Sequence, residues 1–178
     1  MIKHIRKEDL STKTWSGGTT TQLYIYPESS DYKALNFDFR ISTATVEVET
    51  SNFTKLSGIN RLIMSLDGPL SLMHNDGPMI DLLPFEVDAF TGDDETISFG
   101  QVTDFNVMFT RDYKASLKRV ESEIIKTHIT CLYAFDDPSK LTIDNQVYRL
   151  EEGEMLIIMD DQEIQISEPL ICVQLQKN

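Results

Sequence analysis

Residues 36–48 read NFDFRISTATVEV, and this stretch carries the clearest fold signal in the chain. In an extended conformation, one face would carry Phe37, Phe39 and Ile41. The opposite face would carry Asp38, Arg40 and Ser42. Alternation of this kind is typical of a β-strand with one buried face. We therefore predict a strand here, with a guanidinium in the middle of its polar side.

Short segments of the same style, separated by turn residues, recur along the whole chain. In the first two thirds they cover 21–27, 61–66, 70–73, 80–83, 85–90, 96–99 and 105–109. In the last third they cover 129–135, 140–143, 146–150, 155–159, 163–167 and 170–175. Only residues 113–125 could also form a helix, and their alternating Lys, Arg and Glu would equally suit an extended connector. Many short strands with closely spaced turns predict an all-β sandwich or barrel.

A faint internal repeat accompanies these strands. The turn Asp67-x-Pro69 is matched by Asp136-x-Pro138, and Ile97-Ser98 is matched by Ile166-Ser167. Two similar antiparallel units are the simplest explanation of such a repeat. Units of this size would bury one face of each sheet and leave the barrel mouths as natural pockets.

Composition excludes some partners. The chain has 16 Lys and Arg against 29 Asp and Glu, a net charge of −13. This charge argues against nucleic acid or an anionic membrane face as the main partner. The polar start MIKHIRKEDL lacks the apolar core of a secretory signal, and no apolar run approaches the ~20 residues of a membrane helix. Cys131 and Cys172 lie in apolar, strand-like runs and are expected to be buried thiols in a reducing compartment, so we expect a cytoplasmic protein.

Metal and nucleophile signals are weak. The histidines His4, His74 and His128 are far apart in sequence, so the His-x-His pair of a cupin metal site is missing. Acidic clusters such as 93–95 are typical of solvated turns and lack calcium-loop spacing. No Gly-x-Ser-x-Gly elbow occurs, and neither cysteine has a neighbouring histidine. We expect no metal, no cofactor and no catalytic nucleophile.

Several residues could instead bind a ligand. Arg40 could hold a carboxylate in bidentate geometry if its face lines a cavity, or could lie on an exposed sheet face beside Asp38. Asn106 follows the same alternation in its own predicted strand. Trp15 beside a glycine turn could be a pocket wall or a core anchor.

Other residues have plainer explanations. Gly17-Gly18 could cradle an anion, or simply form the turn into the first strand. Arg61 and Arg111 are expected to be structural. His74, beside the hairpin-type sequence Asn75-Asp76-Gly77, is expected to be an exposed turn residue.

Four segments together resemble the HutD/Ves family of bicupins. They are WSGGTTTQL (15–23), FRISTA (39–44), Phe53 with LSGINR (56–61) and LDG (66–68), and PF (84–85) running to GD (92–93), DFNVM (104–108) and Arg111. They cover residues 15–111 in the family's order, and beyond 112 the match is to a generic cupin half. The first segment is two residues shorter than the commonest family form, lacks its Asn and third Gly, and has Gln22 where Glu is usual.

The resemblance implies an all-β bicupin, with two cupin-like antiparallel barrels (double-stranded β-helix) packed together. It assigns residues 1–112 to an N-terminal half with the pocket and 113–178 to a C-terminal half. For a ligand in this pocket we propose contacts with Trp15, Gly17, Gly18, Thr20, Arg40, Ser42 and Asn106. Family members are associated with histidine utilisation or stress responses, and formylglutamate has been proposed as a ligand for one branch. No catalytic activity is attached to the family.

Three functions follow as hypotheses. The first is a metal-free binding or sensing protein for a small polar or carboxylate metabolite. The second is a metal-independent isomerase or hydrolase, for which Asp104 or His74 is the nearest acid or base. The third is a protein-interaction module with filled barrels. A homodimer through a strand edge is also plausible.

Overall fold

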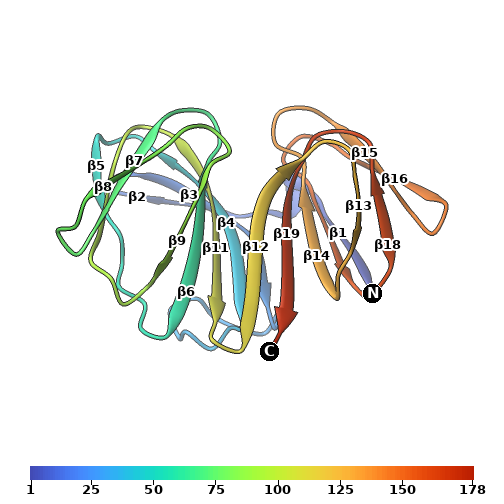
Figure 1. Ribbon diagram of the computed structural model, residues 1–178, viewed down its shortest axis with the longest axis horizontal. Coiled ribbons are helices and arrows are strands. Elements are labelled where there is room, and N and C mark those ends of the chain that lie inside the picture. The colour runs from blue at the N-terminus through green and yellow to red at the C-terminus, as the bar shows by residue number, and fades with distance from the viewer. The chain divides into compact units, whose positions relative to one another are not determined.

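The computed structural model describes all 178 residues and consists of nineteen strands and one 3₁₀ turn (Figure 1). The predicted all-β class is therefore confirmed. The structure contains no helix with the length and apolarity that a membrane span requires. The chain forms two compact units, Ser11–Tyr113 (the N-terminal unit) and Met1–Leu10 with Lys114–Asn178 (the C-terminal unit).

The N-terminal unit contains a six-stranded and a four-stranded sheet. The six-stranded sheet has the order β2 (Thr12–Trp15), β3 (Gly18–Tyr26), β4 (Phe39–Val46), β11 (Thr103–Thr110), β6 (Ile59–Ser65) and β9 (Val87–Thr91). The four-stranded sheet has the order β5 (Thr50–Asn52), β10 (Thr96–Phe99), β7 (Leu70–His74) and β8 (Met79–Leu82). One core cluster joins the two sheets, with Ile63 from the first and Leu70, Leu72 and Leu82 from the second. Burial of these apolar side chains stabilises the pair of sheets.

The C-terminal unit contains a five-stranded and a four-stranded sheet. The first has the order β1 (Ile2–Ile5), β17 (Met155–Met159), β14 (Ile129–Tyr133), β19 (Leu170–Lys177) and β12 (Tyr113–Val120). The second has the order β13 (Glu123–Lys126), β18 (Glu163–Ile166), β15 (Ser139–Ile143) and β16 (Gln146–Leu150). The 3₁₀ turn η1 (Lys7–Asp9) follows β1.

Two sequence expectations are refined by this unit. Residues 113–125, which could have been helical, form β12 and the start of β13. The first ten residues, assigned from sequence to the N-terminal half, belong to the C-terminal unit because β1 pairs with β17. Any part of the chain whose backbone can pair with the unpaired edge of a sheet can form an edge strand there. The position of residues 1–10 in the sequence therefore did not indicate that they join the C-terminal unit.

The internal repeat is visible in the topology. Adding eight to each strand number converts β5-β10-β7-β8 into β13-β18-β15-β16. The same operation converts β9-β6-β11-β4 into β17-β14-β19-β12. The two units therefore share one double-sheet plan, as the repeat predicted.

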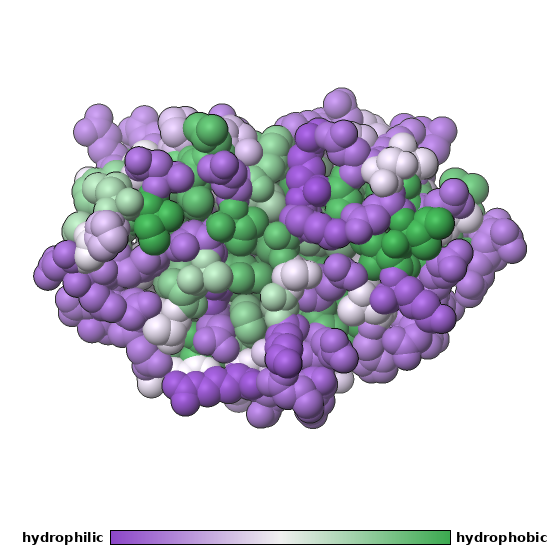
Figure 2. Space-filling model, viewed as in Figure 1, coloured by the Kyte–Doolittle hydropathy of each residue, from purple (hydrophilic) through white to green (hydrophobic).

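Equivalent hairpins close both four-stranded sheets. Asn75 and Asp76, in the four-residue connection from β7 to β8, have φ angles of 50° and 55°, and Asp144 and Asn145, the two residues between β15 and β16, have 48° and 65°. Two successive residues with positive φ are the signature of the tight hairpin turn whose twist matches the strands, and Asn and Asp tolerate that conformation. The periphery of each unit is predominantly hydrophilic in the view of Figure 2, in keeping with the net charge of −13.

Candidate functional site

The inward face of the six-stranded sheet forms the floor of a cavity. Directly paired residues on neighbouring strands project to the same face, so strand register decides which side chains meet. Three rows cross this face of the sheet: Thr20, Ala44, Asp104 and Ser65, then Gln22, Ser42, Asn106 and Ile63, then Arg40, Met108, Arg61 and Phe90. All of them line the cavity except Ser65, Ile63 and Phe90. A sheet face that would ordinarily be an apolar core thus carries two arginines, an aspartate and two amides.

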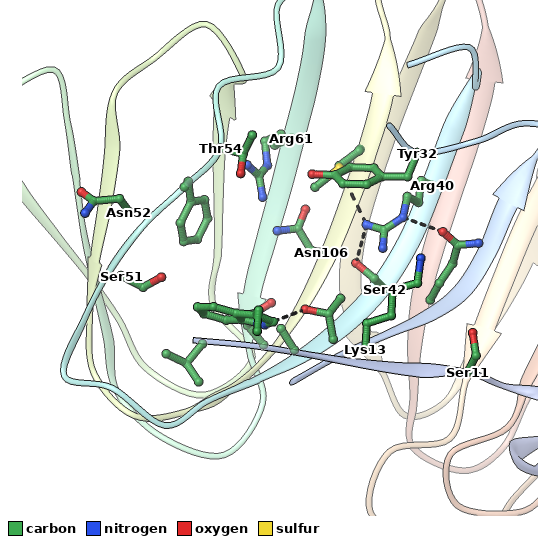
Figure 3. A pocket seen from close by; sticks show the side chains of 18 residues that line it. Ser11, Lys13, Tyr32, Arg40, Ser42, Ser51, Asn52, Thr54, Arg61 and Asn106 are labelled. Atoms are coloured by element: carbon green, nitrogen blue, oxygen red, sulfur yellow. Dashed lines mark hydrogen bonds between the residues drawn. The ribbon is translucent and has the colours of Figure 1, made fainter. Parts of the chain in front are cut away.

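The cavity lies within the N-terminal unit and has a volume of about 400 Å³. This volume is in the range of small-molecule sites. Trp15 and Lys13 of β2 and Tyr32 of the β3–β4 loop contribute to its wall, together with residues around β5 (Figure 3). The cavity therefore suits a metabolite rather than a polymer.

Arg40 is held firmly at one side of the cavity. Its Nε donates to Gln22 Oε1 at 2.8 Å and its Nη1 donates to Ser42 Oγ at 3.2 Å (Figure 3). The guanidinium also lies 4.4 Å from the centre of the Tyr32 ring, a cation–π contact. The side chain is buried, and burial lowers the pKa of Arg40 from its ordinary value. All of these partners are neutral, so the charge of Arg40 has no carboxylate beside it.

Arg61 lies on the other side of the floor and has fewer partners. Its guanidinium lies 4.7 Å from the centre of the Phe53 ring and 5.2 Å from that of Phe90. Its Nε is buried and has no hydrogen-bond partner. Burial lowers the pKa of Arg61 to about 10, and the nearby Asp104 acts in the opposite direction. A buried guanidinium without an ion pair attracts an anion, because the anion would supply the missing partner.

Asp104 faces the same cavity. Its side chain is only 5% exposed, and burial raises the pKa of the carboxyl group to about 7. Arg61 opposes this rise and Asp67 adds to it, while no hydrogen bond acts on the group. Asp104 therefore changes its protonation near neutral pH, in contact with whatever occupies the cavity.

Asn106 projects from the same strand two residues further on. Figure 3 shows it between Arg61 on one side and Arg40 with Ser42 on the other. Its Oδ1 is buried and lacks a hydrogen-bond partner. Buried polar atoms are nearly always hydrogen-bonded, so the Asn106 carbonyl oxygen lacks the donor that such an atom normally has.

The C-terminal unit carries apolar residues at the positions of the two acceptors of β11. Aligned through the repeat and the strand register, Asp104 and Asn106 of β11 correspond to Leu170 and Cys172 of β19. Both of these residues belong to the apolar core of that unit. The polar side chains of Asp104 and Asn106 are therefore specific to the N-terminal unit and are not required by the shared sheet plan.

The glycine turn shapes the cavity without lining it. Trp15 lines the cavity, and its Nε1 donates to Thr20 Oγ1 at 3.2 Å. A Cβ atom on Gly17 would lie 2.1 Å from the Trp15 ring. Gly18 has φ of +149°, and a Cβ atom there would lie 2.0 Å from the carbonyl oxygen of Thr45. The two glycines therefore allow the tryptophan ring and β4 to approach the turn closely.

His74 was expected to be an exposed turn residue, and this expectation is wrong. Its side chain is 15% exposed. Its Nε2 lies 2.8 Å from Asp88 Oδ2 and its Nδ1 lies 2.8 Å from Thr96 Oγ1. As the last residue of β7 it precedes the turn and contacts the Phe90 ring, with centroids 4.7 Å apart. It does not line the cavity.

The structure brings together five of the seven residues proposed from sequence. Trp15, Thr20, Arg40, Ser42 and Asn106 all line the cavity, whereas Gly17 and Gly18 do not. Sequence reasoning missed Tyr32, Gln22 and Phe53 and treated Arg61 as structural. The alternation of the segment INRLIMS does contain a usable signal, because Arg61 and Ile63 share a face. Only the pairing of β6 with β11 reveals that this face is the cavity.

Many cupins hold a metal, and the residues here do not fit one. The structure contains no group of three or more His, Cys, Asp or Glu side chains arranged to hold a metal ion. The floor instead carries two guanidinium groups, which would repel a cation. Its donor set fits an anion.

Solved structures with the same plan include a conserved protein of unknown function from Pseudomonas aeruginosa PAO1. The TM-score is 0.85 over 99% of this chain and 100% of that chain, at 24% identity. HutD from Pseudomonas fluorescens SBW25 (formate condition) gives 0.81 over 100% of both chains, at 20% identity. The oxalate decarboxylase formate complex of Lactobacillus farciminis gives 0.69 over 98% of this chain and 86% of that chain, at 9% identity. Two repeated double-sheet units with this similarity define the protein as a bicupin.

The sequence identifies the family. The model of the HutD family matches residues 7–171, and the chain belongs to that family. A protein of Pseudomonas putida described as an uncharacterized 21.2 kDa protein in the hutC 3′ region is 29% identical over 124 residues. The match covers 66% of this chain and 63% of that relative, so the chain spans less than two thirds of the relative's length.

Proposed function

We propose that this HutD protein binds a small carboxylate metabolite in the cavity of its N-terminal unit, as a metal-free binding or sensing protein. The observation that carries the proposal is the pair of buried arginines, Arg40 and Arg61, neither of which forms an ion pair. A buried charge without a partner is costly, and an anionic ligand would supply the partner. Guanidinium groups suit carboxylates because they donate two parallel hydrogen bonds.

The charge distribution supports an anion in this place. The protein as a whole carries −13, yet the cavity is lined by Lys13, Arg40 and Arg61 against the single carboxyl of Asp104. That carboxyl is partly protonated near neutral pH, because burial raises its pKa to about 7. A local positive field inside an acidic protein selects small anions that can enter the cavity and offers no surface to a polyanion.

The gene context of relatives suggests which acids to test. The Pseudomonas putida relative lies beside hutC, and one solved neighbour is HutD itself. We therefore propose a metabolite of histidine breakdown, with formylglutamate as the first candidate, in a cytoplasmic protein. Formate accompanies two of the structural neighbours and belongs in the same panel as the smallest carboxylate.

The test is a thermal-shift and calorimetric screen with formate, glutamate, formylglutamate and related acids. A ligand at one hundred times its Kd stabilises a folded protein by about 2.7 kcal/mol, which is about 5–10 °C in Tm for a chain of this size. Arg40→Ala should weaken the binding of the active acid by about 10-fold to 100-fold, the effect of a lost charge-assisted hydrogen bond.

The matched control is Arg149→Ala, which removes an exposed guanidinium of the C-terminal unit that pairs with Glu151 at 2.7 Å. It should leave the affinity unchanged. Absence of a shift with every acid, or an equal loss of affinity in Arg40→Ala and Arg149→Ala, would contradict the proposal.

Metal-independent acid–base catalysis is a second candidate function. Asp104 favours it, because this carboxyl group lines the cavity and burial raises its pKa to about 7, close to the value that a general acid or base needs at neutral pH. His74, the other candidate from sequence, is engaged with Asp88 outside the cavity. Proton NMR of each bound acid in D₂O would detect exchange or hydrolysis, and Asp104→Asn should abolish it. A ligand that remains chemically unchanged for hours with the wild type leaves binding as the function.

A further inference from the structure

The strand β11 presents two acceptor groups, Asn106 and Asp104, in the two rows next to the row that carries both arginines. Asp104 and Asn106 project from alternate positions of this central strand, while Arg40 and Arg61 project from the strands that flank it. Along β11 the floor therefore passes from the row of the two arginines to the acceptor of Asn106 and then to that of Asp104. Figure 3 shows Arg61, Asn106 and Arg40 on this floor.

Neither acceptor is satisfied by the protein. Asn106 Oδ1 is buried with no hydrogen-bond partner, and no hydrogen bond acts on the Asp104 carboxyl group. Both side chains are about nineteen-twentieths buried, with 6% and 5% exposed. Buried acceptors without a donor are destabilising and are rarely kept without a compensating partner.

A plain carboxylate can satisfy the arginines but not these two acceptors. Carboxylate oxygens only accept hydrogen bonds, and so do Asn106 Oδ1 and an ionised Asp104. Placed across the floor, a ligand with carboxylates alone would set oxygen against oxygen over β11. The complement of the floor is a molecule with an anionic group for the arginines and an N–H or O–H group for the central strand.

We propose that the ligand of this site is a carboxylate that also carries a hydrogen-bond donor, a hydroxyl, amide N–H or ammonium group, and that Asp104 with Asn106 selects it over acids without one. The inference rests on the proposed carboxylate binding and adds the chemical class of the ligand. It makes Asp104 a specificity-determining residue, because an acceptor rejects a ligand that leaves it unpaired.

The experiment uses acids that differ only in the donor, with the wild-type full chain at pH 8, where Asp104 is mainly ionised because its pKa is about 7. The first pair is 2-hydroxyglutarate and glutarate. The second is N-acetylglutamate and N-acetyl-N-methylglutamate, in which a methyl group replaces the amide hydrogen. Calorimetry should give at least tenfold tighter binding for the donor-bearing member of one pair, the effect of one hydrogen bond to a charged group.

Asp104→Asn then tests the assignment, because its amide can donate to an acid that lacks a donor of its own. This variant should reduce the preference to threefold or less. Asp81→Asn, which alters an exposed carboxylate on β8 outside the cavity, should leave the preference intact. Circular dichroism and Tm confirm that each variant is folded.

The outcomes separate the two proposals. Equal affinity of the wild type for both members of each pair refutes the donor requirement and leaves carboxylate binding in place. A preference that persists unchanged in Asp104→Asn refutes the role of Asp104. Absence of binding by all four acids, together with absence of binding in the wider screen, overturns both proposals.

Discussion

Asp104→Asn should change the pH dependence of the free energy of unfolding. The wild-type carboxyl group is buried, and burial raises its pKa to about 7 from an ordinary value of 3.8. Between these two pH values the folded protein holds a proton that the unfolded chain releases. The contribution of the protonated Asp104 to the free energy of unfolding is therefore fully present below about pH 3.8 and is lost as the pH rises through 7.

The size of the effect follows from the two pKa values. They differ by about 3, and each pH unit between them corresponds to about 1.4 kcal/mol, so the contribution is about 4 kcal/mol. Asparagine has similar shape and cannot ionise. The free energy of unfolding of Asp104→Asn should therefore gain about 4 kcal/mol relative to the wild type between pH 4 and pH 8. In Tm this gain is about 8–16 °C for a chain of this length.

Chemical denaturation of both proteins at half-unit pH steps measures the difference directly. All other titrating groups are common to the two chains, so subtraction isolates Asp104. Asp81→Asn, with an exposed carboxylate, is the matched control and should run parallel to the wild type. Curves for Asp104→Asn and wild type that stay parallel within about 1 kcal/mol would show that the floor is hydrated, and the argument from burial would fail.

Three further predictions concern the turn, the rim and the core. Gly18→Ala should lower the free energy of unfolding by about 3 kcal/mol, because the added Cβ would collide with the backbone of β4. Gly58→Ala is the control: its Cβ would have no atom within 4 Å, and it should lower the free energy of unfolding by about 1 kcal/mol. Urea denaturation of both variants measures the difference. Trp15, the single tryptophan, should change its fluorescence on titration with the ligand and give the same Kd as calorimetry. An unchanged spectrum at saturation would show that Trp15 does not contact the ligand. Cys131 and Cys172 are buried thiols whose pKa values are raised by burial, so a thiol reagent at pH 8 should react with them only after denaturation.

The sequence by itself determined the strands and the repeat. Alternation of apolar and polar residues is a property of neighbours in the chain, so a segment such as 36–48 can be predicted as a strand without tertiary information. The matched turns at Asp67 and Asp136 likewise indicated two units of one plan, which the strand orders of the four sheets bear out. The resemblance to the HutD family also rested on local motifs, and the family match over residues 7–171 confirms it.

Only the tertiary structure decided which polar face lines a cavity. The sequence pattern places Asp38 and Arg40 on the same face of the predicted strand. In the structure Arg40 lines the cavity, whereas Asp38 does not line it and accepts a hydrogen bond from Tyr113. Arg61 and Asp104 join the site through the register of β6 with β11, a pairing of segments distant in the chain. Register between distant strands depends on how both sheets close over a common core, and no pattern within one strand encodes it.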